Sequence, residues 1–74
     1  MTDARTLVAE AIERPRDHVP ANGTIETVEG WDSLGHMRIM LALEARLGRP
    51  METEEILELA SVEAIDRLLN GGSG

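Results

Sequence analysis

The stretch that decides the fold is Gly30-Trp31-Asp32-Ser33-Leu34-Gly35-His36-Met37-Arg38-Ile39-Met40-Leu41-Ala42-Leu43-Glu44-Ala45-Arg46-Leu47-Gly48. A polar pair, Asp32-Ser33, stands directly before a long run of apolar residues. Such a pair predicts the start of a helix, because Asp or Ser at the cap accepts a hydrogen bond from an unpaired N–H of the first turn. Gly48, followed by Pro50, is a stop signal. The sequence therefore predicts a helix over about 33–47, with the Ser33 hydroxyl where the helix begins.

The predicted helix is apolar on two sides. One stripe, at spacings of three and four residues, consists of Ile39, Met40, Leu43 and Leu47. A second stripe, rotated away from the first, consists of Leu34, Met37 and Leu41. A single core can use only one stripe fully. An exposed apolar patch with a polar rim is typical of a docking surface.

Three further helices are predicted. The first is capped by Thr2 or Asp3 and ends near Arg14, which precedes a proline, and its buried face is formed by Ala4, Leu7, Val8, Ala11 and Ile12. A short third helix over about 54–59 is expected to be capped by Thr53, with its apolar residues pointing inward or toward the second helix; these are Ile56, Leu57 and Leu59. The fourth is expected to begin after Ser61 and to end at about Leu69, and it buries Val62, Ile65, Leu68 and Leu69.

Residues 15–31 contain two prolines and two glycines and are predicted to form a long loop. A loop of this length in a small domain needs anchors, and the candidates are Val19, Ile25, Val28 and Trp31. The alternation over 25–28 is weakly strand-like, but the sequence offers no second strand to pair with it. We expect a loop with at most a short turn.

The chain has 74 residues, no cysteine and a formal net charge of −7. This length predicts one small domain, with no disulfide and no thiol of its own. The negative charge argues against nucleic-acid binding and suits a soluble monomer. There is no membrane-spanning run and no signal peptide, so we expect a cytoplasmic protein. His18 and His36 lack metal-ligand spacing, and we predict no metal site and no catalytic triad.

Asp32-Ser33-Leu34, the helix that follows and its late Leu43-Glu44 together resemble the attachment site of acyl and peptidyl carrier proteins. The resemblance covers about 3–69. It implies an all-α fold, a small antiparallel four-helix bundle with a short third helix and a long loop between helices 1 and 2. We expect a carrier domain over 1–70 and a flexible tail over 71–74.

The resemblance implies that Ser33 carries 4'-phosphopantetheine from coenzyme A, transferred by a holo-acyl-carrier-protein synthase. The arm's thiol would hold an acyl or aminoacyl group as a thioester, and the protein itself would catalyse nothing. Asp32 would cap the helix and contact the synthase. Partner enzymes, meaning acyl- or aminoacyl-loading ligases, synthases or transferases, would contact Leu34, Met37, Arg38, Leu41 and Glu44. The alternative for Leu34, Met37 and Leu41 is a place in the core, as is usual for Met and Leu at helical spacing, and for Leu41 both stay open.

The chain departs from the family pattern at Gly35, His36 and Arg38, where many members carry acids that basic partner enzymes meet. The hypothesis is a specialised carrier with dedicated enzymes, in secondary metabolism or another non-housekeeping pathway. A solvated helix face is the alternative, in which Gly35 only costs helix stability, of order 1 kcal/mol. For the whole chain, the alternative is an acidic helical interaction domain in which Ser33 is an unmodified cap. The cargo stays open, as does the choice between a stand-alone protein, which the ends of the chain favour, and an excised domain.

Overall fold

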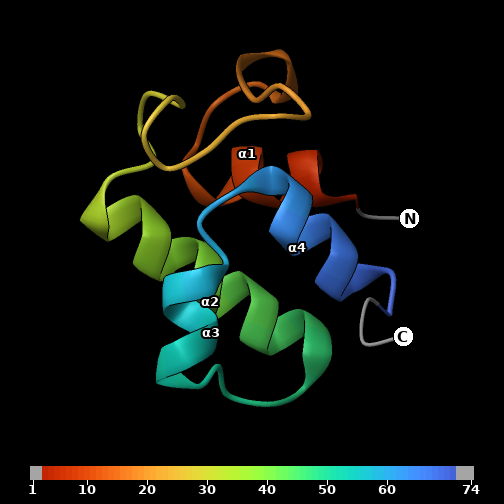
Figure 1. Cartoon of the computed structure of the whole chain (residues 1–74). Coiled ribbons are helices and arrows are strands. Elements are labelled where there is room, and N and C mark those ends of the chain that lie inside the picture. Colours follow the sequence, from red (N-terminus) through yellow and green to blue (C-terminus); the bar gives the residue numbers. More distant parts are fainter. Residues whose placement is uncertain (1–2, 72–74) are drawn as a thin grey trace.

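A computed structural model describes residues 3–71, and within them the chain forms four α-helices, one turn of 3₁₀ helix and no strand. The elements in chain order are α1 (Ala4–Ala11), η1 (Arg16–His18), α2 (Ser33–Leu47), α3 (Thr53–Glu58) and α4 (Val62–Leu69). Figure 1 shows α1 beside α4, and α1 also packs against α2, with the long loop folded over one end of the helices. This confirms the predicted all-α bundle with a short third helix. The tail predicted over 71–74 and the alternative cap Thr2 lie outside the described residues, apart from Gly71.

Side-chain caps begin α1 and α4 as expected. Asp3 accepts a hydrogen bond from Thr6 N at 2.8 Å, and Ser61 Oγ accepts one from Ala64 N at 3.1 Å. The cap predicted for α3 was wrong by one residue, because Thr53 is its first helical residue and Glu52 is the cap. The Glu52 N–H donates to Glu55 Oε1 at 3.0 Å, so an acid three residues later satisfies this backbone group.

Helix α1 ends at Ala11, earlier than the boundary predicted at Arg14. The chain turns at Glu13, whose φ of 59° lies in the left-handed region. The N–H groups of Glu13 and Arg14 donate back to the carbonyls of Glu10 and Ala9, at 3.2 and 2.9 Å. This arrangement is a Schellman motif, which normally has glycine at the left-handed position. The sequence signal was absent because Glu13 stands where glycine is expected.

One hydrophobic core holds the helices together. Its fully buried large side chains are Trp31, Ile39, Leu43, Ile65, Val8 and Val19. The loop anchors Val19, Val28 and Trp31 are buried as predicted, whereas Ile25 is half-buried. Each large apolar side chain that is fully buried contributes about 1.5–3 kcal/mol to folding, so the long loop is part of the core and not a cover over it.

The loop between α1 and α2 is also tied to the connection between α3 and α4. Thr24 and Ser61 form an isolated antiparallel bridge. Ile25 N donates to the Ala60 carbonyl and Val62 N to the Gly23 carbonyl, both at 2.9 Å. The strand-like alternation over 25–28 thus forms no strand, as expected, but its first residues do find a backbone partner far along the chain.

Gly35, which the sequence marked as a cost to helix stability, is buried against the loop. A Cβ at this position would collide with the Gly30 carbonyl oxygen and would lie 3.1 Å from Ile12 Cγ2. Gly30 itself has a φ of 95°, so the backbone turns sharply just before α2. The glycine therefore permits the close approach of loop and helix on which the position of Trp31 depends.

We predict that Gly35→Ala lowers the free energy of unfolding by about 1–3 kcal/mol, because backbone must move to admit the methyl group. Helix propensity alone would favour alanine by about 1 kcal/mol. The matched control is Ala45→Gly at an exposed position of α2, which should cost only the propensity difference. Urea unfolding measures both, and a Gly35→Ala protein more stable than the parent would contradict the close approach.

Glu55 forms a two-pronged ion pair with Arg49, with N–O distances of 2.9 and 2.8 Å. These hydrogen bonds, aided by the Glu52 N–H, lower the pKa of Glu55 to about 2 from its ordinary value of 4.5. A carboxyl whose pKa is lower in the folded state than in the unfolded state stabilises the fold at every pH above its unfolded-state pKa. That contribution is lost as the pH falls from about 4.5 toward 2.

We therefore expect Glu55→Gln to lower the urea midpoint at neutral pH and to lose this effect progressively as the pH falls below 4.5. Glu54→Gln removes the same charge from the same helix turn and controls for net charge. A difference between parent and Glu55→Gln that stays constant with pH would contradict the pairing.

Candidate functional site

Asp32 sets the beginning of α2. Its carboxylate Oδ1 accepts a hydrogen bond from Gly35 N at 2.8 Å, and its carbonyl accepts one from His36 N at 2.7 Å. Ser33 is consequently the first residue of the helix, and it is exposed. Among the side-chain hydrogen bonds of residues 3–71, none involves the Ser33 hydroxyl. The sequence prediction that Ser33 begins this helix is confirmed, with Asp32 as its cap.

The two apolar stripes of α2 have separate environments. Ile39, Met40 and Leu43 are buried, and Leu47 is half-buried. The second stripe faces outward, since the exposed fractions of Leu34, Met37 and Leu41 are 61%, 57% and 60%. An uncovered row of three large apolar side chains on one helix is a candidate contact surface next to Ser33.

Leu57 on α3 was expected to point inward or toward α2, and this prediction was wrong. Its exposed fraction is 74%, while Ile56 is half-buried and Leu59 is buried. Helix α3 has only six residues, and the inward positions are taken by Ile56 and by Leu59, the residue that follows the helix. Leu57 therefore adds a further exposed apolar side chain, on α3, that sequence reasoning had assigned to the interior.

The two charged residues predicted to contact partners differ in their surroundings. Arg38 is exposed, and its Nη1 lies 3.3 Å from Glu13 Oε2 at the end of α1. Glu44 is half-buried, and its Oε2 accepts a hydrogen bond from Met51 N at 3.0 Å. Glu44 thus fastens the connection between α2 and α3, a structural role that its spacing on the helix could not reveal.

His36 is half-buried and joins two segments to α2. Its Nδ1 accepts a hydrogen bond from Trp31 Nε1 at 2.9 Å, and its Nε2 lies 2.7 Å from the Ile56 carbonyl oxygen. The two rings are stacked, with centroids 6.1 Å apart. The sequence had placed His36 on the exposed, partner-facing side, so its role in packing was missed.

A small hollow of about 170 Å³ opens beside the start of α2. It is lined by Ile12, Arg14, Gly30, Asp32, Leu34, Gly35 and Arg38. Arg14 lies over Gly30 and forms a long ion pair with Glu29, at 3.8 Å. Two guanidinium groups, of Arg14 and Arg38, therefore flank one side of the helix start. This local arrangement could not be expected from the net charge of −7 for the whole chain.

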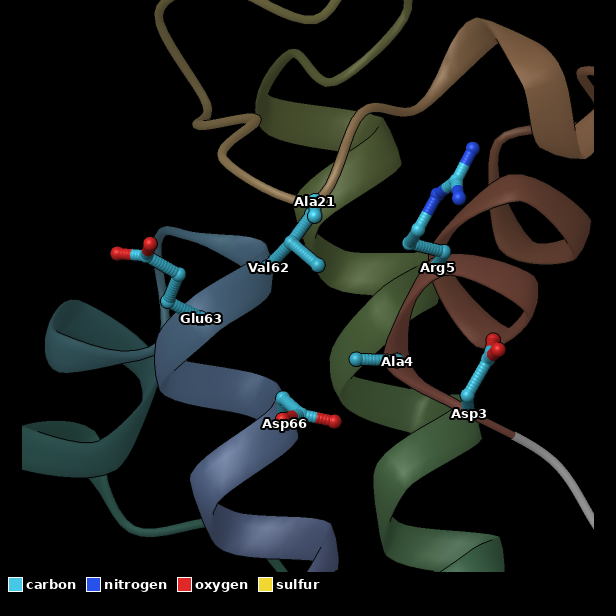
Figure 2. A pocket seen from close by; sticks show the side chains of 7 residues that line it. All are labelled: Asp3, Ala4, Arg5, Ala21, Val62, Glu63 and Asp66. Atoms are coloured by element: carbon cyan, nitrogen blue, oxygen red, sulfur yellow. The ribbon is translucent and has the colours of Figure 1, made fainter.

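A second hollow, of about 230 Å³, lies between the first turns of α1 and α4 (Figure 2). Its lining includes the acids Asp3, Glu63 and Asp66 and none of the residues around Ser33. The Arg5 side chain points away toward the loop, where its Nε donates to the Val19 carbonyl. Within residues 3–71, no group of three or more His, Asp or Glu side chains could hold a metal ion. No helix in this range is long and apolar enough to cross a membrane.

The arrangement around Ser33 suits covalent attachment of a phosphate-linked group. The hydroxyl belongs to an exposed residue, so an attached arm would extend into solvent. The first turn of a helix carries free N–H groups and partial positive charge, which favour a phosphate close by. The residues present therefore fit a phosphodiester at Ser33.

Comparison with known families agrees with this geometry. A family model described as the phosphopantetheine attachment site matches residues 3–69, which covers nearly the whole described chain. No curated protein matches the sequence. Domains of this family are where 4'-phosphopantetheine is attached covalently, and they act as carriers for other enzymes. The chain belongs to the phosphopantetheine-attachment family of carrier domains.

Proposed function

We propose that Ser33 is the residue that bears 4'-phosphopantetheine and that the chain carries an acyl or aminoacyl group between enzymes. The observation that supports this most is the exposed position of Ser33 as the first residue of α2, directly after the Asp32 cap. The attached arm supplies the thiol that this cysteine-free chain lacks. The chain is a carrier and performs no catalysis of its own.

The attachment step transfers one phosphoryl-linked group. The Ser33 oxygen forms a bond to the pantetheine-bearing phosphorus of coenzyme A, and the P–O bond to the second phosphate breaks. Adenosine 3',5'-bisphosphate leaves, and the hydroxyl proton passes to a base of the holo-acyl-carrier-protein synthase. Asp32 holds the helix start through Gly35 N and presents its remaining carboxylate oxygen to the synthase.

We further propose that partner enzymes dock on the outward side of α2, over Leu34, Met37 and Leu41. Arg38 and Arg14 place two exposed guanidinium groups at the edge of this surface, where a partner's acids would compete with their present partners Glu13 and Glu29. Glu44 stands at the inner edge, where its carboxylate is engaged with Met51 N. A basic edge would be met by acids on a partner, which supports a specialised carrier with dedicated enzymes.

The second candidate is an interaction domain in which Ser33 is never modified. The exposed side chains of Leu34, Met37, Leu41 and Leu57 favour a partner surface under either function. The two functions differ in the fate of the Ser33 hydroxyl, which is where an experiment separates them.

We expect incubation with coenzyme A and a promiscuous holo-synthase to raise the mass of the protein by one phosphopantetheine. Ser33→Ala should abolish the increase, because it removes the attacking oxygen. Thr53→Ala is the matched control, since Thr53 is also an exposed hydroxyl residue at the first position of a helix, and this variant should still be loaded. Intact-mass spectrometry gives the result, and an unchanged mass for the folded parent protein would favour the interaction domain.

Arg38→Glu should alter kcat/KM for the enzymes that load and use this carrier, by about tenfold if a close charge pair of 1.4 kcal/mol is lost. Arg67→Glu changes the same charge on the exposed side of α4 and should leave these kinetics unchanged. Initial rates with each cognate enzyme measure the effect. Equal kinetics for Arg38→Glu and the parent with every partner would argue that α2 presents only a solvated face.

A further inference from the structure

The His36 ring is the side chain through which three segments meet: the end of the long loop, the first turns of α2, and α3. Trp31 Nε1 lies 2.9 Å from Nδ1, and the Ile56 carbonyl oxygen lies 2.7 Å from Nε2. Trp31 is buried, with an exposed fraction of 2%, so its indole N–H depends on this one acceptor.

The two partners determine where the ring carries its proton. An indole N–H only donates, so Nδ1 must be without hydrogen. A carbonyl oxygen only accepts, so Nε2 must carry the hydrogen. The neutral Nε2–H tautomer satisfies both partners. A second proton would place Nδ1–H against the indole N–H, donor facing donor, and the ring would have to turn. Because both nitrogens belong to one rigid ring, turning Nδ1 away from Trp31 also draws Nε2 away from Ile56.

Helix α3 itself contributes little to the core, although Met51 before it and Leu59 after it are buried there. Within Thr53–Glu58 no residue is buried, and Ile56 is half-buried. The pair between Arg49 and Glu55 fastens α3 to the segment just before it and not to α2. Among the side-chain hydrogen bonds of residues 3–71, the bond from His36 to the Ile56 carbonyl is therefore the one that connects α2 to α3.

Charged groups on the surrounding segments are engaged elsewhere or exposed. On α2 and its cap, Asp32 accepts from Gly35 N and Arg38 pairs with Glu13. On the loop, Glu29 pairs with Arg14. At α3, Glu55 pairs with Arg49, and the remaining acids are exposed; these are Glu52, Glu54 and Glu58. In the part of the chain that the structure describes, no ion pair joins any of them to His36.

We propose that His36 is a pH-sensitive latch: its neutral ring fastens Trp31 and α3 to the start of α2, and its protonation releases both. Histidine is the side chain type that mild acid can charge, and the two hydrogen bonds of this ring are made only by its neutral form. Release would free the buried indole N–H and loosen α3, which His36 holds from a position three residues after Ser33. The latch is a property of the unmodified chain and does not rest on the proposed function of Ser33.

The test follows the unmodified protein by NMR from about pH 8 to about pH 5, the range in which histidine changes charge. We expect the Trp31 indole N–H resonance to move together with the titration of the His36 ring. Hydrogen-exchange protection factors of the Ile56 and Leu59 amides, which bond to the Glu52 and Glu55 carbonyls, should fall roughly tenfold. Protection of Leu7 in α1 and Ile65 in α4 should not change.

Two variants make the test specific. His36→Gln keeps a neutral group that accepts and donates, so both responses should vanish. His18→Gln is the matched control, because His18 bonds the Glu29 carbonyl in the loop and this variant should respond like the parent. An indole resonance that stays fixed while His36 titrates in the parent protein would overturn the proposal, and so would a response that persists in His36→Gln.

Discussion

The hydrogen bond from the Gly35 N–H to the Asp32 carboxylate, 2.8 Å long, decides where α2 begins, and the site follows from that choice. It makes Ser33 the first helical residue, outside the core and beside the free N–H groups of the first turn. It also sets the rotation of the helix. Ile39 and Leu43 then point into the core, while the stripe that begins at Leu34 points to solvent.

A second constraint acts on the same turn, where loop and helix come into contact without a side chain between them. Gly35 admits the Gly30 carbonyl, and Gly30 takes a left-handed turn. Trp31 is thereby placed in the core with its indole N–H directed at His36. Two glycines that weaken local structure thus allow the one aromatic side chain to link the loop to the bundle.

The parts of the fold that could be predicted from the sequence depend on local rules. Apolar spacing and capping residues predicted four helices, and Asp32-Ser33 predicted where α2 begins. The errors concern contacts between residues far apart in the sequence and positions that carry no sequence signal. Nothing near Ile25 in the sequence points to Ala60, and nothing near His36 points to Ile56. Leu57 was assigned to the interior because periodicity alone cannot say how few positions a six-residue helix can bury. Glu13 ends α1 without the glycine that normally marks such a turn.

The central claim is that one hydroxyl, at the start of α2, is the covalent handle of the chain. Tryptic digestion of the loaded protein should release residues 17–38 as one peptide, which contains Ser33 together with Thr24 and Thr27. Fragmentation of that peptide by tandem mass spectrometry locates the added group directly. The account predicts that all of the added mass lies on Ser33, and phosphopantetheine on either threonine, or on a different peptide, would contradict it.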